Sequence, residues 1–534
     1  MSAELNLHPV LIAGEWQPAD RPVGTFTATN PATRTPLPDK YPVSSVDEVD
    51  RACVAGHVAA TALRSFPDAA DRIAAFLADY ADAIEAAADR VVEIAARETG
   101  LAVSPRLRDV ELPRTTNQLR QGAHAARDRS WCLATIDTKT NIRSCYSSLA
   151  GPVAVFGPNN FPFAFNSIAG GDFVAAVAAG NPVIGKANTG HPGTTRLLAE
   201  LALQAAQRRG LPAGFLQLLY RTPPAGGFRL VAHPKTAATG FTGSKSAGLQ
   251  LKAAADAAGT PIYLEMSSVN PVFILPGALE ERGAAIAREL FDSCTLGAGQ
   301  FCTRPGITIV PADGAERFLA ELAALFERSP AGTLLAESGI QGIAQAIQVL
   351  CDHGAELVTG GRAVEDGRFS FANTLLRTTG TAFVQSPQAM QTEAFGAVNT
   401  VVVCDDVPQM IEIAAALDGS LTGCLYSAAS GADDDAYTRV ASVLRHRVGR
   451  LLNDKMPTGV AVSPAMNHGG PYPATGHPGF TAVGIPASML RFAALHCYDN
   501  VRAHRLPREL ADENPTGTMW RCIDGVWTQG NVKR

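Results

Sequence analysis

The feature that most constrains this sequence is the regular alternation of strand-like and helix-like segments between residues 151 and 258. Short aliphatic runs, typical of buried strands, occupy residues 152–156, 182–186, 215–220 and 237–241. Longer runs with helical spacing separate them, at residues 169–179, 194–208 and 246–258. Strands that alternate with helices pair in parallel, because each helix returns the chain to the starting edge of the sheet. The alternation therefore predicts an α/β fold with a doubly wound, Rossmann-type sheet that binds a nucleotide.

Further α/β structure is expected outside this region. At 534 residues the chain exceeds the size of a single hydrophobic core, so two or three domains are expected. Residues 68–97 form an alanine-rich block with apolar side chains at three- and four-residue spacing, which predicts helices packed outside a sheet. A second α/β segment runs from about residue 263 to 453. We expect it to form a second domain.

The remaining segments have a different character. Residues 130–149 alternate polar and apolar side chains, which predicts extended hairpin strands, and residues 491–500 resemble a strand that returns to them. Residues 454–486 are rich in glycine and proline, so we expect an irregular loop across the cleft between domains. Residues 501–534 form a polar tail.

Charge and hydropathy exclude several classes of protein. The formal net charge of −5 gives no reason to expect a nucleic-acid or anionic-membrane partner. No stretch approaches the ~18 consecutive apolar residues of a membrane-spanning helix. Met1 to Pro9 lack a basic segment followed by an apolar one, so we expect no secretory leader.

The ten cysteines are scattered along the chain without a C-x-x-C pair or a Cys/His cluster with zinc spacing. This distribution predicts no metal site. In a chain of this length it is typical of free thiols in a reducing compartment, so we expect a cytoplasmic protein.

One cysteine lies in an unusual context. Cys302 follows Gly297 and Gly299 and precedes Gly306, in a loop between a helix-like run and the strand-like run at residues 307–310. Glycines allow backbone conformations that bring a ligand close. The loop fits an exposed nucleophile that reacts as its thiolate. A structural loop cysteine fits the local sequence equally well.

Five segments together resemble the aldehyde dehydrogenase superfamily, over roughly residues 11–500. They occur in the order found in that superfamily: Phe-Gly-Pro-Asn-Asn-Phe-Pro at 156–162, Gly-Phe-Thr-Gly-Ser at 240–244, Leu-Glu-Met-Ser-Ser-Val-Asn-Pro at 264–271, Gly-Ala-Gly-Gln-Phe-Cys at 297–302 and Glu-Ala-Phe-Gly at 393–396. The resemblance implies NAD(P)-dependent oxidation of an aldehyde to a carboxylic acid, through a cysteine thiohemiacetal and a thioester.

The resemblance also implies a division of the chain into parts. Residues 1–129 and 150–262 would form the cofactor-binding domain, and residues 263–460 the α/β catalytic domain. Residues 130–149 and 488–500 would form a β oligomerisation arm, which implies a homodimer or homotetramer. Residues 461–487 would be the cleft loop and residues 501–534 a C-terminal tail.

Three residues match the superfamily's catalytic positions. Cys302 would add to the aldehyde, and the Asn160 amide, with the backbone N–H of Cys302, would stabilise the oxyanion. Glu265 would activate water to hydrolyse the thioester. The superfamily's Glu-Leu-Gly-Gly is Glu-Met-Ser-Ser here. Two of these residues also have a purely structural interpretation. Asn160 could be a turn asparagine, and Glu265 a solvated glutamate at a strand end.

The cofactor residues follow from the same resemblance. Gly243 and Ser244 open a helix whose free N–H groups would hold the pyrophosphate. Lys186 matches the lysine that bonds the adenosine ribose, and Glu393 and Phe395 match residues at the nicotinamide ribose and ring. Position 189, where many NAD-specific members have a glutamate, is threonine, which removes repulsion of a 2′-phosphate. We therefore expect NADP or NAD, with NADP favoured. Thr189 could also simply cap a turn.

The substrate would be a small-molecule aldehyde, and the resemblance is greatest to the branch that acts on 2,5-dioxovalerate (α-ketoglutarate semialdehyde). Residues 159–165, 191–194, 300–303 and 468–475 carry this finer resemblance. A semialdehyde is thus the favoured substrate, and a fatty or aromatic aldehyde is the alternative. An acylating dehydrogenase that releases a CoA thioester, and a catalytically silent homologue that serves as a binding protein, are the competing functions.

Overall fold

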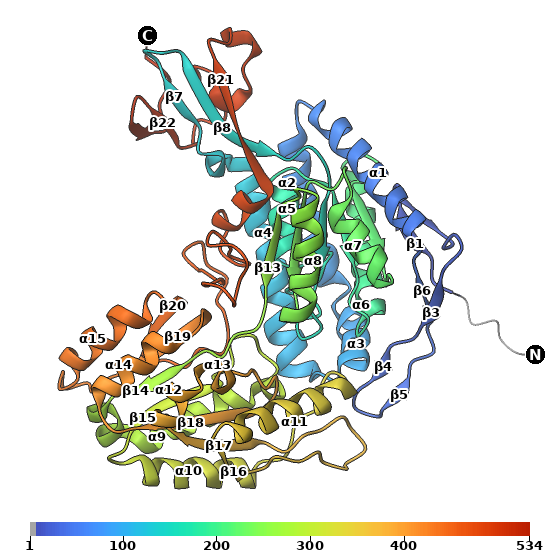
Figure 1. Ribbon diagram of the computed structural model, residues 1–534. Helices are drawn as coiled ribbons and strands as arrows, with labels where there is room; N and C mark the ends of the chain where they lie inside the picture. Colours follow the sequence, from blue (N-terminus) through green and yellow to red (C-terminus); the bar gives the residue numbers. More distant parts are fainter. Residues whose placement is uncertain (1–6, 534) are drawn as a thin grey trace, which may run out of the picture.

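The computed structural model describes residues 7–533, and three β-sheets dominate its architecture (Figure 1). The expectation that no secretory leader is present falls largely on residues 1–6, which lie outside the described residues. No helix in the described part of the chain is both long enough and apolar enough to cross a membrane.

The first sheet has seven strands in the order β13-β12-β9-β10-β11-β1-β2. Strands β9 to β13 are parallel, and β1 joins β11 in the antiparallel sense as part of an N-terminal hairpin. The bounds are β1 Val10–Ile12, β2 Glu15–Gln17, β9 Val153–Phe156, β10 Val183–Lys186, β11 Leu216–Leu219, β12 Ala238–Thr242 and β13 Ile262–Glu265. The four strands expected from the alternating pattern agree with β9 to β12, and the expected α/β fold is confirmed.

Helices cover both faces of this sheet (Figure 1). They are α1 Val46–Arg64, α2 Ala69–Ala86, α3 Ala88–Thr99, α4 Leu112–Asp128, α5 Gly171–Ala178, α6 Pro192–Arg208, α7 Pro224–Ala232 and α8 Lys245–Ala257, with a π-helical turn at Val103–Glu111 before α4. In α2 the buried face includes Ile73, Phe76, Leu77, Tyr80 and Ile84, at the helical spacing seen in the sequence.

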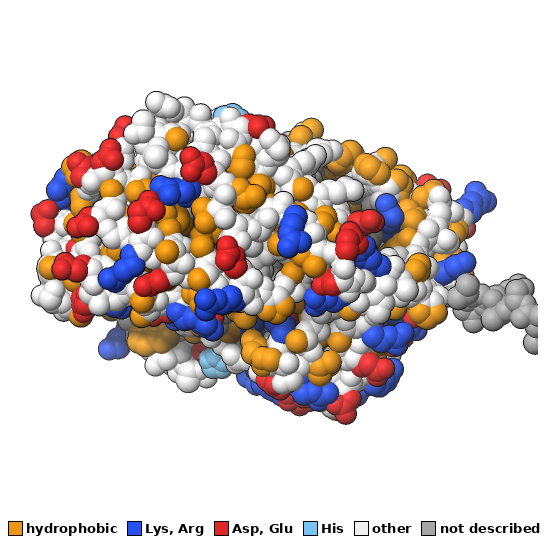
Figure 2. Space-filling model, turned by 90° about the horizontal axis from the view of Figure 1, so that it is seen from below, with side chains coloured by type: hydrophobic (Ala, Val, Ile, Leu, Met, Phe, Trp, Pro, Cys, Tyr) orange, Lys and Arg blue, Asp and Glu red, His pale blue; other side chains and the backbone are white. Residues whose placement is uncertain are grey.

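The second sheet also has seven strands, in the order β16-β17-β18-β15-β14-β19-β20. Its strands are β14 Val272–Ile274, β15 Ile307–Pro311, β16 Glu356–Thr359, β17 Thr374–Thr379, β18 Val398–Cys404, β19 Ser420–Tyr426 and β20 Val448–Asn453. Its helices are α9 Pro276–Thr295, α10 Ala315–Arg328, α11 Glu337–Asp352, α12 Gly380–Gln385, α13 Pro387–Met390, α14 Val407–Ala416 and α15 Asp434–Leu444. The sheet separates two buried apolar clusters, one on each face. On the face in Figure 2, acidic and basic side chains are interspersed.

The third sheet projects from the body of the molecule (Figure 1). Its order is β21-β8-β7-β22-β23, with β7 Thr135–Asp137, β8 Ile142–Ser148, β21 Ala493–Asp499, β22 Arg521–Ile523 and β23 Val526–Thr528. The expected hairpin and returning strand correspond to β7, β8 and β21. The sequence did not predict that the polar tail adds β22 and β23 to the same sheet.

Short pairs near the N-terminus and an irregular segment complete the chain. The short strands are β3 Gly24–Phe26, β4 Thr29–Asn30, β5 Thr35–Pro36 and β6 Tyr41–Val43, and 3-10 turns lie at Ser130–Cys132, Leu296–Gly299, Ala487–Phe492, Ala503–Arg505 and Arg508–Leu510. Residues 454–486 carry no helix or strand, as expected. This loop lies between the first two sheets (Figure 1) and brings His468 to the site described next.

Candidate active site

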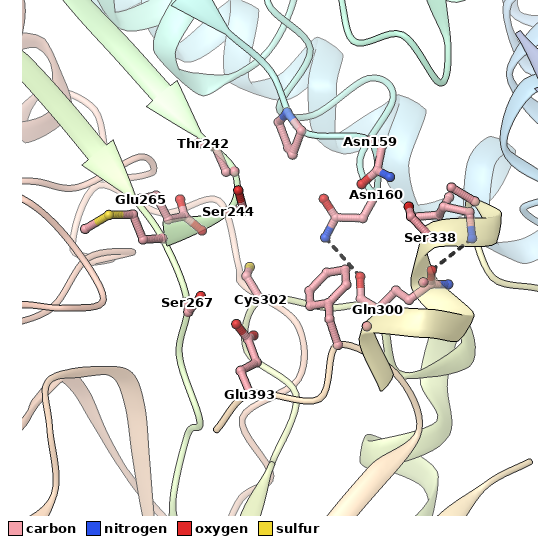
Figure 3. A pocket seen from close by; sticks show the side chains of 18 of the residues that line it. Asn159, Asn160, Thr242, Ser244, Glu265, Ser267, Gln300, Cys302, Ser338 and Glu393 are labelled. Carbon is pink, nitrogen blue, oxygen red and sulfur yellow. Dashed lines mark hydrogen bonds between the residues drawn. The ribbon is translucent and has the colours of Figure 1, made fainter. Parts of the chain in front are cut away.

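A cavity of about 410 Å³ contains most of the residues singled out in the sequence. Its lining combines the C-terminal ends of β12 and β13, the loop after α9, the start of α11 and the loop after α13 (Figure 3). The predicted residues that line it are Asn160, Gly243, Ser244, Glu265, Cys302, Glu393 and Phe395. Segments far apart in the sequence therefore meet at the carboxyl ends of parallel strands, where α/β folds bind ligands.

The loop that carries Cys302 is held tightly from two sides. Gly299 has a φ of +71°, and a Cβ there would lie 2.2 Å from the backbone carbon of Gly396, so only glycine fits. The side-chain amide of Asn270 donates to the carbonyls of both Cys302 and Arg304, at 2.9 Å each. These contacts fix the position of the thiol relative to the loop that bears Glu393 and Phe395.

Cys302 is half-buried, which corrects the expectation of an exposed nucleophile. The preceding residue, Phe301, packs edge-on against Phe161 with ring centroids 5.2 Å apart and draws the loop inward. Burial raises the pKa of the Cys302 thiol well above its ordinary value, and the Glu265 carboxylate raises it further. The thiol is therefore protonated at neutral pH and needs a base to react.

His468 lies within hydrogen-bond range of both the Cys302 thiol and the Glu265 carboxylate. Its Nε2 is 3.5 Å from Sγ of Cys302 and 2.9 Å from Oε1 of Glu265. Glu265 and His468 are only 1% and 2% exposed. Among the described residues Oε2 of Glu265 has no hydrogen-bond partner, so this oxygen can accept from water. His468 and Glu265 can thus take a proton from the Cys302 thiol and later from a water molecule.

The Asn160 side chain is also held in place. Its Nδ2 donates to the carbonyl of Gln300 at 2.9 Å (Figure 3), which leaves a second N–H for a ligand. The Gln300 side chain in turn accepts from the backbone N–H of Leu335 at 2.9 Å. Arg106 donates from Nη2 to the Asn160 carbonyl, also at 2.9 Å. An amide fixed in this way suits the stabilisation of an oxyanion formed near Cys302.

The other wall of the cavity fits a dinucleotide. Ser244 is the N-cap of α8, and its hydroxyl accepts from the backbone N–H of Ala247 at 3.3 Å, which leaves other N–H groups of the first turn for a phosphate. Opposite lies the half-buried Glu393, a suitable acceptor for ribose hydroxyls. Burial raises its pKa, and the charge of Arg304 opposes that rise, with smaller contributions from the Ser267 side chain and the Ser268 backbone. The Ser-Ser pair that replaces two glycines thus supports the Glu393 carboxylate.

Lys186 and Thr189 do not line this cavity. Lys186 ends β10 and is half-buried; burial, with a smaller effect from the Arg221 charge, lowers its pKa to about 8. Thr189 lies in the turn between β10 and α6 and is half-buried. The structure places both on the N-terminal side of α6, at the edge of the first sheet that also carries the N-terminus of α8.

The sequence pattern of the Aldehyde dehydrogenase family matches residues 16–470, which is most of the chain. The chain belongs to the aldehyde dehydrogenase family. This dehydrogenase is 39% identical over 510 residues to alpha-ketoglutaric semialdehyde dehydrogenase 2 of Azospirillum brasilense, covering 92% of this chain and 94% of that one. It is 35% identical over 519 residues to the alpha-ketoglutaric semialdehyde dehydrogenase of Acinetobacter baylyi, covering 95% and 96%.

The fold of this aldehyde dehydrogenase also matches solved structures. Lactaldehyde dehydrogenase from Escherichia coli superposes with a TM-score of 0.79 at 22% identity, over 92% of this chain and 98% of that one. The expected family membership, enzyme class and fold are confirmed.

The residue of the candidate site that the sequence analysis did not assign in this aldehyde dehydrogenase is His468. It was visible as part of the His-Gly-Gly-Pro-Tyr-Pro-Ala-Thr segment at 468–475, but no local pattern linked it to Cys302. With Glu265 and Cys302 it also forms the one group of His, Cys or acidic side chains in the described residues that could hold a metal ion, with ligand atoms within 4.8 Å of one another.

Proposed function

We propose that this aldehyde dehydrogenase oxidises a semialdehyde that carries a carboxylate, with 2,5-dioxovalerate as the favoured substrate. The observation that supports the reaction is the contact of His468 with both Cys302 and Glu265 at the cavity. The choice of substrate is supported by the two relatives named as alpha-ketoglutaric semialdehyde dehydrogenases, which match nearly the whole chain.

In the first half of the proposed reaction, His468 Nε2 takes the proton of the Cys302 thiol, and the thiolate adds to the aldehyde carbon. The new C–S bond converts the carbonyl into an oxyanion. The free N–H of Asn160 and the backbone N–H of Cys302 donate to this oxyanion. A bound nicotinamide would supply the acceptor for the hydride that leaves the adduct as the thioester forms.

In the second half, Glu265 acts as the general base. Its Oε2 accepts a proton from water, and the hydroxide attacks the thioester carbon. The C–S bond breaks, the carboxylic acid leaves and Cys302 is regenerated as a thiolate. Burial and the neighbouring Glu265 carboxylate favour the thiol, so the thiolate takes back a proton from the His468–Glu265 pair. This retained base supports hydrolysis over transfer to coenzyme A.

Aldehyde dehydrogenases use NAD(P), and we propose NADP as the preferred form here. Gly243 and Ser244 would hold the pyrophosphate, and Glu393 and Phe395 would hold the nicotinamide half. Thr189 presents no negative charge to a 2′-phosphate, and Lys186 can offer a positive one.

The roles of the three sheets, the oligomeric state and the cellular compartment are also proposals. The first sheet with its helices would serve as the cofactor domain, the second as the catalytic domain and the projecting sheet as the arm of a homodimer or homotetramer. None of the ten cysteines, all in the described residues, forms a disulfide, which is compatible with the cytoplasm.

A panel of aldehydes assayed with NAD and NADP tests the reaction. We expect the highest kcat/KM for 2,5-dioxovalerate, lower values for hexanal and benzaldehyde, and carboxylic acid as the product. Cys302→Ala should lose aldehyde oxidation and keep cofactor affinity, because the thiol forms the covalent bond with substrate. Cys497→Ala, at an exposed cysteine of β21, is the control. Oxidation that survives in Cys302→Ala would refute the mechanism, and a preference for hexanal or benzaldehyde would refute the substrate.

A further inference from the structure

Arg114, in the first turn of α4, is a half-buried residue whose guanidinium forms no ion pair within residues 7–533. Its guanidinium carbon lies 5.6 Å from the ring centroid of Phe161 and 5.2 Å from that of Phe165. Its Nε and Nη2 are buried and have no hydrogen-bond partner among residues 7–533. Burying an unpaired cation is costly, and contacts with two aromatic faces offset only part of that cost.

The charge of Glu111 offsets part of this cost, but its oxygens form their hydrogen bonds with other groups. Glu111, three positions earlier, has one carboxylate oxygen bound to Arg106. Its other oxygen accepts from the backbone N–H groups of Phe163 and Ala164, at 2.8 and 3.0 Å. Burial lowers the pKa of Arg114, yet a guanidinium keeps its proton in proteins. Arg114 is thus left as a cation that can accept a new anionic partner.

The position of Arg114 relates it to the reacting centre. Phe161 follows Asn160 in the chain, and the Phe165 ring lies 5.6 Å from the His468 ring. Phe161 and Phe165 belong to a buried apolar cluster with Phe301, which precedes Cys302, and Phe480. Burial lowers the pKa of the Arg114 guanidinium, and Glu111, Cys302 and Glu265 oppose that shift, so Cys302 and Glu265 lie within electrostatic range of it. Neither these rings nor Arg114 lines the cavity of the candidate active site, so the apolar cluster separates the guanidinium from the part of the site that fits a dinucleotide.

We propose that Arg114 binds the carboxylate of the aldehyde substrate and so makes the enzyme specific for aldehydes that also carry an acid group. A carboxylate can accept two parallel N–H bonds from a guanidinium, which is the strongest pairing available to this side chain. A neutral aldehyde of equal length would leave the cation unpaired and would lose that interaction. This inference rests on the proposed semialdehyde function and assigns the residue that selects the substrate.

Paired substrates test the proposal. The kcat/KM of wild type, Arg114→Gln and Arg114→Lys is measured for 2,5-dioxovalerate and succinic semialdehyde, and for the neutral pentanal and butanal. In Arg114→Gln, kcat/KM should fall about 100-fold for the two semialdehydes, mainly through a higher KM. For the two neutral aldehydes it should fall no more than about threefold. Arg114→Lys should recover part of the loss. Arg120→Gln, at an exposed arginine of the same helix that pairs with Asp82 and Glu85, should change neither.

A second readout separates binding from a structural role. Because Arg114→Gln removes a buried unpaired charge, its melting temperature should equal or exceed that of wild type. Glutarate, an acid without an aldehyde, should inhibit wild type competitively and Arg114→Gln about 100-fold more weakly. Equal losses on acidic and neutral aldehydes, or a lowered melting temperature with unchanged glutarate inhibition, would overturn the proposal. If wild type and Arg114→Gln prefer semialdehydes over neutral aldehydes by the same ratio of kcat/KM, the role of Arg114 is refuted. The proposed function then stands. Wild type without that preference would overturn both.

Discussion

A single atom, Nε2 of His468, contacts both the proposed nucleophile, Cys302, and the proposed general base, Glu265. One nitrogen cannot accept from the thiol and donate to the carboxylate in the same protonation state. The proton removed from Cys302 must therefore be shared between His468 and Glu265 before a water molecule is activated. Burial supports this order of proton transfers, because it keeps the Cys302 thiol protonated until a base takes the proton.

The two bases should give different kinetic defects. In Glu265→Gln, thioester hydrolysis should slow by about 100-fold, because an amide cannot accept the proton of water, so a burst of reduced cofactor precedes slow turnover. In His468→Asn, the burst itself should slow, because the thiol loses its nearest proton acceptor. Stopped-flow absorbance of the reduced cofactor measures both phases. A wild-type hydrolysis rate in Glu265→Gln would mean that another group activates water.

Cofactor choice should depend on position 189 and on pH. Thr189→Glu places a carboxylate near a 2′-phosphate and should lower the NADP-to-NAD ratio of kcat/KM by about 10-fold to 100-fold. In wild type, Lys186 is charged below its pKa of about 8 and neutral above it. The NADP-to-NAD ratio of kcat/KM in wild type should therefore fall as the pH rises from 7 to 9. Thr189→Ser is the control. A ratio that neither the glutamate nor the pH changes would show that the phosphate is recognised elsewhere.

At the scale of elements, the site depends on how irregular segments are attached to regular ones. The loop after α9 is held by Gly299 against Gly396, and the loop after α13 carries Glu393 on the same side. The 454–486 loop has no regular structure of its own, but the bridge between Glu265 and Thr475 ties it to the end of β13. Strand ends and loops are therefore fixed together, which brings His468 within hydrogen-bond range of both Cys302 and Glu265.

Gly299→Ala tests this attachment. Gly259→Ala is a matched control, because Gly259 has a φ of +70°, against +71° for Gly299, but has nothing within 4 Å of the added Cβ. The control should cost about 1–2 kcal/mol of stability from backbone strain alone. Gly299→Ala should cost at least ~3 kcal/mol, because the Cβ collides with backbone, and should also lower kcat by displacing Cys302. Thermal unfolding and steady-state rates measure both effects, and equal losses in the two variants would contradict the role given to this contact.

At the scale of the whole molecule, the C-terminal tail extends the projecting sheet. Strand β22 pairs with β7 in parallel, and β23 then forms the edge. Arg521 is fully buried, and it donates to the carbonyls of Ala511 and Gly530 at 2.5 and 2.9 Å. Met519 is also fully buried. The tail is thus an integral part of the arm.

A chain that ends at residue 512 should lose this support. Without β22 the edge of β7 is left unpaired, and the pocket filled by Met519 becomes exposed, so the melting temperature should fall and aggregation should increase. Light scattering and thermal unfolding measure these effects. Trp527→Ser, at a half-exposed residue of β23, keeps the strand pairing and is the control. An unchanged melting temperature and mass in the truncated chain would show that the tail is dispensable for the arm.

The sequence by itself determined the parallel sheet and singled out three residues of the candidate active site. Periodicity in residues 151–258 specifies strands and helices through local geometry, and Cys302, Glu265 and Asn160 stand in motifs that are recognisable without any contact. These properties depend on neighbours in the sequence, so they can be read from it. The expected exposure of Cys302 was wrong because burial depends on distant side chains such as Phe161.

Only the tertiary structure decided which distant residues share the site. His468 lies 166 positions from Cys302 and 203 from Glu265, in a loop without periodicity, so no local pattern places it there. The unpaired state of Arg114 likewise depends on which partners Glu111 has already taken, and the tail's place in the arm depends on a strand nearly 400 positions away. Such contacts arise from packing among segments that are adjacent only after folding, and packing is a property of the whole molecule.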